Sequence, residues 1–110
     1  MSLDPTLDVT VDEDITIRFA VTNRGTEAVE LTFRTGQHAD VTVHDTDTDV
    51  AVWRWSDDKM FTQALERVTL SPGETLEHEY TWSDPQSGDY VAVATLEADR
   101  DAETRVEMTI

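Results

Sequence analysis

Apolar and polar residues alternate along most of the chain, which is the pattern of β-strands that bury one face. The clearest run places Ile15, Ile17, Phe19 and Val21 at every second position. The same rhythm returns in shorter runs near residues 7–11, 29–33, 41–43, 50–55, 61–70, 76–82, 90–96 and 106–110. The run at 90–96 is apolar at nearly every position, which indicates a central strand, and we expect the last run to be an edge or closing strand.

Turn residues separate these runs, as in Asn23-Arg24-Gly25 and Ser71-Pro72-Gly73. About eight short strands at a spacing of about 8–12 residues predict an all-β domain. We favour an immunoglobulin-like β-sandwich of antiparallel strands with Greek-key connections over a barrel. Gly88-Asp89-Tyr90 partly matches the tyrosine corner of such sandwiches. The chain is expected to form one domain over residues 1–110, with residues 1–5 as a flexible end or a cloning remnant.

The charge balance is strongly acidic: 24 acidic residues against 8 basic ones give a net charge of −16. This balance argues against nucleic-acid binding, which needs a basic surface. The acids are spread along the chain and Lys59 is the only lysine, a composition typical of a halophilic protein from a high-salt cytoplasm. An ordinary acidic protein is the alternative. The first twenty residues resemble neither a secretory signal nor a membrane span, so we expect a cytoplasmic protein without membrane contact.

Asp45, Asp47 and Asp49 form the strongest candidate for a metal site, because alternate carboxylates in a loop can converge on calcium. An EF-hand loop requires glycine at its sixth place and a bidentate acid at its twelfth, where this chain has Val50 and Ser56. An acidic hairpin turn explains the run more simply. A calcium-stabilised module stays as a lesser alternative, and it predicts that calcium raises the melting temperature more than magnesium does.

Other signs of catalysis or cofactor binding are missing from the sequence. His38, His44 and His78 lack zinc spacing, and His78 lies on the apolar face of its run, where we expect a hydrogen-bonded core histidine. No serine sits in a Gly-x-Ser-x-Gly elbow, and the four glycines fall in separate turns. There is no cysteine for a disulfide, a thiolate site or a nucleophile. We therefore predict no enzyme, no cofactor and no metal.

Two tryptophans mark the most informative segment. Trp53 and Trp55 are two residues apart and share a face, with Arg54 on the other, and our interpretation places both in the core with Phe61, Trp82 and Tyr90. The polar stretch between Trp55 and Phe61 nevertheless has the composition of a loop pinned at both ends. The candidate protein-binding loop therefore consists of Trp55, Ser56, Asp57, Asp58, Lys59, Met60 and Phe61. Weaker candidates are the loops of Gly36, Gln37 and His38, and of Asp84, Pro85, Gln86, Ser87 and Gly88.

Several short segments follow one another in a specific order: Val21-Thr22-Asn23-Arg24-Gly25, the run from Leu31 to Asp40, Val52-Trp53-Arg54-Trp55-Ser56-Asp57, Phe61-Thr62-Gln63-Ala64, Leu70-Ser71-Pro72-Gly73-Glu74, Tyr80-Thr81-Trp82 and Gly88-Asp89-Tyr90. Together and in this order they resemble the intracellular proteinase inhibitor family of bacilli known as BsuPI. The resemblance extends from about residue 6 to residue 110. It implies an immunoglobulin-like fold, a cytoplasmic location and inhibition of intracellular subtilisin-like serine proteases. One departure is Asp47-Thr48-Asp49, where the family tends to have a glycine-containing hairpin turn.

The expected function is that of a non-catalytic, monomeric protein-binding domain that inhibits a subtilisin-like serine protease. Met60 or Phe61 would fill an apolar specificity pocket, with Trp55 anchoring the base of the loop. The alternative is an adaptor, a protein–protein interaction module without a protease target, because a fold does not fix a function.

Overall fold

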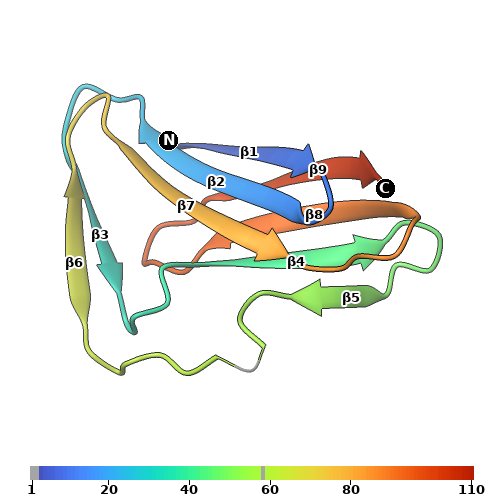
Figure 1. The fold of residues 1–110 in the computed structure, drawn as a ribbon. Coiled ribbons are helices and arrows are strands. Elements are labelled where there is room, and N and C mark those ends of the chain that lie inside the picture. The colour runs from blue at the N-terminus through green and yellow to red at the C-terminus, as the bar shows by residue number, and fades with distance from the viewer. Residues whose placement is uncertain (1–2, 58) are drawn as a thin grey trace.

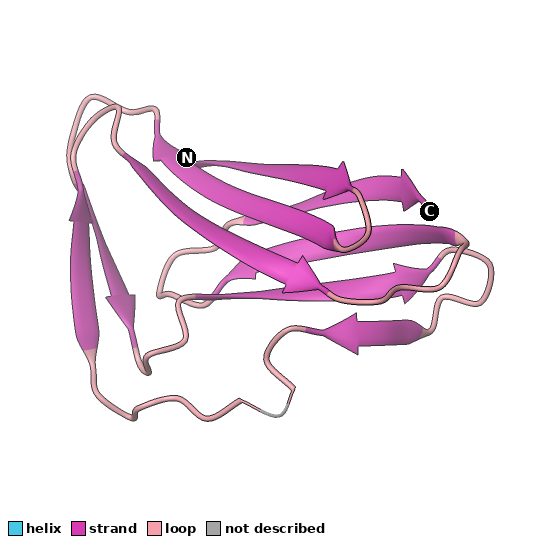
Figure 2. Ribbon diagram, viewed as in Figure 1, coloured by secondary structure: helices cyan, strands magenta, loops and turns pink. Residues whose placement is uncertain are grey.

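The computed structural model describes residues 3–57 and 59–110, which form nine strands and no helix (Figures 1 and 2). The strands are β1 (Leu3–Val11), β2 (Ile15–Asn23), β3 (Val29–Phe33), β4 (Ala39–Asp45), β5 (Ala51–Arg54), β6 (Glu66–Leu70), β7 (Thr75–Trp82), β8 (Asp89–Leu96) and β9 (Glu103–Thr109). Within these residues no helix is long and apolar enough to cross a membrane. The predicted all-β sandwich is confirmed, with nine strands where we expected about eight.

Two sheets make up the layers of the sandwich. One has the order β1-β2-β7 and the other the order β5-β4-β8-β9, and Figure 1 shows them stacked. β3 and β6 form a separate two-stranded sheet at one end, and every pairing is antiparallel. β1 contacts β9 along one side of the sandwich. On the other side the edge strands β5 and β7 face each other through Trp53 and Trp82, whose rings are 6.1 Å apart.

The alternating pattern predicts the core correctly. Ile15, Ile17, Phe19 and Val21 are all buried between the two sheets. β8 lies between β4 and β9, as its apolar sequence predicts, and β9 is an edge strand. The apolar pattern of residues 61–70 is not one strand, however, because β6 begins only at Glu66. The first strand is longer than its apolar residues indicate, since β1 begins at Leu3 and pairs with β2 from there.

Asn23 ends β2 and is the one fully buried polar side chain among the described residues. Its Nδ2 donates hydrogen bonds to the carbonyl oxygens of Glu27 (2.8 Å) and Leu70 (2.9 Å). Its Oδ1 accepts a hydrogen bond from the amide of Gly25 at 2.9 Å. One side chain thus holds the turn after β2 against the end of β6.

The main chain of Asn23 joins a second turn to the first. Its amide donates to the carbonyl of Glu74 (3.0 Å), and its carbonyl accepts from the amide of Gly73 (2.7 Å). Gly73 has a φ of 83°, and the amide of Glu74 bonds the carbonyl of Ser71, the geometry of a type II turn with Pro72 and Gly73 at its centre. The β2–β7 ladder therefore bends into the β3–β6 ladder where these two turns meet.

A tyrosine corner fixes the start of β8. The hydroxyl of Tyr90 donates a hydrogen bond to the carbonyl of Gln86 at 2.8 Å, four residues upstream. The ring is buried and meets Trp82 edge-on at 5.1 Å. The partial sequence match at residues 88–90 therefore forms the contact that ties such sandwiches together.

The acidic surface leads to a prediction about salt. Acidic side chains outnumber basic ones 24 to 8, so most carboxylates have no cation partner and repel one another in dilute buffer. Molar NaCl screens charges beyond about 3 Å, and we expect it to stabilise the domain. An added stability of about 1 kcal/mol raises the Tm of a domain of this size by about 4–8 °C. Thermal melts across NaCl concentrations measure this, and a Tm that stays constant or falls contradicts the prediction.

Candidate functional site

The connection from β5 to β6 crosses from one sheet to another over residues 55–65 and contains no strand among its described residues (Figure 1). Met60 is 98% exposed, whereas Trp55 and Phe61 are half-buried. The crossing therefore presents one large apolar side chain to solvent between two aromatic anchors. Of the predicted loop, Asp58 lies outside the described residues.

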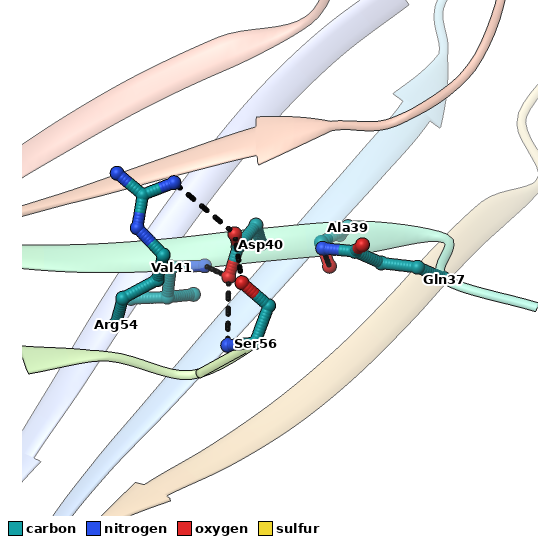
Figure 3. Close-up of polar contacts among 6 residues, drawn as sticks. All are labelled: Gln37, Ala39, Asp40, Val41, Arg54 and Ser56. Carbon is teal, nitrogen blue, oxygen red and sulfur yellow. Dashed lines mark hydrogen bonds and ion pairs between the residues drawn. The ribbon is translucent and has the colours of Figure 1, made fainter. Parts of the chain in front are cut away.

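Asp40 holds the beginning of the crossing (Figure 3). Its carboxylate is almost fully buried and accepts hydrogen bonds from the Ser56 hydroxyl (2.6 Å), the Ser56 amide (3.2 Å) and the Val41 amide (2.9 Å). The Arg54 guanidinium lies 3.8 Å from it. These partners compensate the burial of a charge, which would otherwise be costly. No sequence pattern indicates this role, because Asp40 is a single acid beside an apolar run.

The Trp55 ring organises the rest of the crossing. Phe61 packs against it with ring centroids 5.7 Å apart, and the Lys59 ammonium lies 5.1 Å from its centroid, within cation–π range. Tyr80 meets the ring edge-on at 4.8 Å. Burial, with a smaller contribution from Asp40, raises the pKa of Tyr80 above its usual value, so its hydroxyl is neutral. Two side chains of the crossing, Lys59 and Phe61, thus contact the same indole.

The aromatic residues differ from our interpretation in their burial. Trp82 and Tyr90 belong to the core as predicted. Trp53 and Trp55 only pack against the core from its open side and stay half-exposed. Phe61 rests on Trp55 and is also half-exposed. The reason is that β5 is an edge strand. Its inward side chains have neighbours on the side of β4 but no further strand of the same sheet on the other side.

The loop of Gly36, Gln37 and His38 lies beside the far end of the crossing. The Gly36 amide donates a hydrogen bond to the carbonyl of Thr62 at 2.9 Å. A Cβ on Gly36 would lie 2.9 Å from the Thr62 Oγ1, so glycine permits the close approach. Two of the three predicted loops therefore form one surface.

The loop of residues 84–88 lies at the opposite end of the sandwich. β4 and β8 are antiparallel, so Ala39 pairs with Leu96 and Asp45 pairs with Tyr90. The loop of residues 84–88 comes just before β8 and is therefore near the end of β4. The loop of residues 36–38 comes just before β4 and is therefore near the end of β8. Gly88 also exchanges two backbone hydrogen bonds with Ile110, which fixes this loop to the end of the chain. It does not join the other two loops.

His38, in the loop of residues 36–38, lies next to His78 of β7. His38 stacks on Phe33 at 4.2 Å, and its Nε2 is 2.9 Å from a carboxylate oxygen of Glu66. The His78 ring lies 5.7 Å from His38, and its Nε2 is buried without a hydrogen-bond partner in the described part of the protein. The prediction that His78 is hydrogen-bonded in the core is therefore wrong for its Nε2. Burial and, to a smaller extent, His38 lower the pKa of His78 below its usual value.

Replacing His78 with phenylalanine is expected to stabilise the domain and to change how its stability depends on pH. The apolar ring removes the buried unpaired nitrogen, which should add about 1 kcal/mol to the free energy of unfolding. The lowered pKa means that, below about pH 6.5, the unfolded wild type binds more protons than the folded one and stability falls. Urea titrations from pH 7.5 to 5 should show the variant's advantage growing as the pH falls. If the free energies of unfolding of wild type and variant change with pH in parallel, the loss of stability at low pH does not come from His78.

The Asp45 carboxylate serves the turn between β4 and β5. It accepts hydrogen bonds from the amides of Asp47 (2.8 Å) and Thr48 (3.3 Å), while the Asp49 amide bonds the Asp45 carbonyl. Asp49 has a φ of 58°, a left-handed conformation that aspartate tolerates better than most residues. It takes the conformation that glycine usually adopts in such a turn. Within residues 3–57 and 59–110, no three His, Cys, Asp or Glu side chains are grouped to hold a metal ion.

Solved structures with a similar fold include proteins of unrelated kinds. The sporulation control protein Spo0M from Bacillus subtilis superimposes with a TM-score of 0.62 at 12% identity, over 99% of this chain and 49% of that one. A penta-heme cytochrome c552 from Thermochromatium tepidum gives a TM-score of 0.60 at 13% identity, over 99% and 40%. The chain thus spans about half or less of these proteins, and at such identities the likeness concerns the fold alone. A search of curated proteins finds no match.

The family comparison is specific. Residues 3–101 match the family described as intracellular proteinase inhibitor, BsuPI. The match includes β1 to β8, the crossing and both turns that meet at Asn23. The resemblance found in the sequence segments is therefore confirmed: this chain belongs to the BsuPI family of intracellular proteinase inhibitors.

Proposed function

We propose that this domain is a monomeric, non-catalytic inhibitor of an intracellular subtilisin-like serine protease, and that the crossing after β5 enters the protease cleft with Met60 in the specificity pocket. The observation that carries the proposal is the exposure of Met60, 98%, between Trp55 and Phe61, which are held against the sandwich. Methionine is long, unbranched and apolar, so it adapts to apolar pockets of different shapes. Phe61 packs against Trp55 and acts as the anchor.

Rigidity is what separates an inhibitor from a substrate. A loop that is already fixed in the bound conformation loses little entropy on binding. The Asp40–Ser56 hydrogen bonds fix the crossing before Met60, and the Gly36–Thr62 hydrogen bond fixes it afterwards. The loop would therefore enter the cleft with its ends already placed.

The contacts of Trp55 also favour resealing of a cut chain. If a protease cleaves the peptide bond after Met60, Lys59 lies on one side of the cut and Phe61 on the other. Both contact the Trp55 ring, through the cation–π contact and through ring packing. The two new ends would stay close to each other, and the nucleophilic amine could attack the acyl-enzyme again instead of diffusing away.

Phe61→Ala tests this anchoring. We expect the variant to inhibit at first and then to lose inhibition over time, because the new amino terminus no longer packs on Trp55 and leaves the cleft. Mass spectrometry of the mixture should show cleavage after Met60 at least about 10-fold faster than in the wild type, as loss of a contact worth about 1.4 kcal/mol implies. Cleavage at the wild-type rate would contradict a role for Phe61 in retention.

The proposed function is tested directly by titrating a subtilisin-type protease with the purified domain in molar salt. We expect hydrolysis of a small peptide substrate to fall in proportion to the added domain and to reach near zero at equimolar concentration. The heat-unfolded domain serves as the control for simple competition by a substrate. Unchanged hydrolysis at a large excess of folded domain would rule out inhibition of that protease.

A further inference from the structure

A second surface adjoins the proposed inhibitory loop. A groove of about 450 Å³ runs along the open side of the sandwich, between the edge strands β5 and β7. The residues that line it include Trp53, Arg54, Trp55 and Lys59 on the side of β5 and Thr81 of β7. It begins where the crossing leaves β5, so a protein that grips the crossing reaches this groove as well.

The outer edge of β5 has main-chain groups that β4 does not use. β5 ends the order β5-β4-β8-β9, and the Trp55 amide donates to the carbonyl of Val41 in β4. Main-chain groups of successive strand residues point in opposite directions, so the Arg54 amide faces away from β4. The Arg54 carbonyl points to the same side but accepts the Asp57 amide at 3.2 Å, so the Arg54 amide is the group at this end of the edge that another extended segment can bond when it adds as a strand.

The groove is rich in basic residues although the molecule as a whole is strongly acidic. The whole chain has a net charge of −16, yet Arg54 and Lys59, two of its eight basic residues, line this groove together with one described acid, Asp57. The Arg54 side chain is half-exposed and lies 3.8 Å from Asp40, outside close hydrogen-bond distance. Lys59 lies over the Trp55 ring. Arg54 pairs with Asp40 but keeps about half of its side chain exposed, and Lys59 is exposed as well, so an acidic side chain that enters the groove can reach both cations.

From these observations we infer that the β5–β7 groove is a second docking site, which takes an extended acidic segment of the captured protein by strand addition to β5. The identity of that protein rests on the proposed function, but the chemistry of the groove does not. Alternate side chains of the segment would reach the cations, and the strand would bond the Arg54 amide. The tryptophan rings would cover its apolar atoms.

Nuclear magnetic resonance tests the groove without any protease. The isotope-labelled domain is titrated with the blocked peptide Thr-Glu-Val-Glu-Thr and with its basic twin Thr-Lys-Val-Lys-Thr. We expect saturable shifts of the Arg54 amide and of the Trp53 and Trp55 indoles, with the acidic peptide binding about 5-fold or more tightly. Equal responses to both peptides, or shifts elsewhere than β5, would overturn the proposal. Shifts of the same signals with domain concentration alone would assign the edge to a second copy and would also overturn it.

Variants at Arg54 separate its charge from its amide. Arg54→Gln removes the charge, and with it the ion pair with Asp40, but keeps the main-chain amide. Arg54→Pro also removes that amide, and an edge strand tolerates proline there because the amide faces away from the β4 ladder. We expect Gln to weaken binding of the acidic peptide about 5-fold and Pro to abolish it. The matched control is Arg105→Gln on the opposite edge strand β9, which should bind as the wild type does. Wild-type binding by both Arg54 variants, with unchanged thermal melts, would sink the proposal.

The same variants in the protease titration distinguish this inference from the proposed function. If the wild type inhibits and Arg54→Gln raises the inhibition constant about 5-fold while Arg105→Gln does not, both are supported. If the wild type inhibits and all variants match it, the groove does not contact the protease. If the wild type fails to inhibit, the proposed function fails, and the peptide titration alone decides whether the groove binds acidic strands.

Discussion

Asn23→Ala is expected to lower the free energy of unfolding by about 3 kcal/mol or more, the largest loss of stability from any single polar truncation in the described structure. The side chain is fully buried and makes three hydrogen bonds, to Gly25, Glu27 and Leu70. Its removal leaves main-chain groups without partners, and each buried unsatisfied group costs about 1–3 kcal/mol. Since domains of this kind are stable by only about 5–15 kcal/mol, the variant should be close to unfolding at physiological temperature.

Urea unfolding of two further variants defines what is lost. Asn23→Asp keeps the shape but turns an acceptor oxygen toward the carbonyls of Glu27 and Leu70, so we expect at least the same loss as for alanine. Thr22→Ala removes the neighbouring, exposed hydrogen bond to Thr75 and should cost about 1 kcal/mol or less. A loss below about 1 kcal/mol for Asn23→Ala would show that water replaces the side chain and that the two turns do not depend on it.

Much of the fold could be predicted from local patterns, because local rules decide it. The period-two alternation around Phe19 identifies the strand and its buried face at once. The sequence of β8 is apolar on both faces of the strand, which is typical of a strand in the middle of a sheet, and β8 indeed lies between β4 and β9. Pro72-Gly73 predicts a turn that the chain indeed makes, with the φ that glycine allows.

The rest depends on how well neighbours cover a face, which a pattern does not report. Trp53 and Trp55 point inward as predicted, but no strand lies beyond β5 to bury them. His78 also lies on the predicted face, yet its Nε2 has no partner there. Phe61 continues an apolar rhythm that is not part of a strand, because residues 61–65 are needed to cross between sheets.

The sequence predicts which residues belong to the candidate loop but not which contacts hold the loop in place. Two aromatic residues around a polar stretch single out the crossing between Trp55 and Phe61. What holds it comes from elsewhere in the sequence: Asp40 is 16 residues before Ser56, and Gly36 bonds Thr62 across the same surface. Such contacts follow only from the pairing of β4 with β5, which brings the beginning of one strand to the end of the other.

Met60→Asp is expected to weaken inhibition of a subtilisin-like protease by about 100-fold or more. A side chain that fills a desolvated pocket at the centre of an interface typically contributes about 2–4 kcal/mol, and each 1.4 kcal/mol changes affinity tenfold. Aspartate adds the cost of placing a charge in an apolar pocket. Because Met60 is 98% exposed, the substitution should change the free energy of unfolding by no more than about 0.5 kcal/mol. Inhibition constants and urea titrations on the same preparations measure both effects.

Two variants show whether the loss belongs to the pocket. Met60→Leu keeps an apolar side chain of similar volume and should stay within about 10-fold of the wild type. Leu65→Asp adds the same charge at another exposed apolar residue of the crossing and should inhibit normally. If Met60→Asp inhibits as well as the wild type while folded, the crossing does not enter the cleft. The contact would then have to lie elsewhere, and the loop of residues 84–88, at the opposite end of the sandwich, is the place to test next.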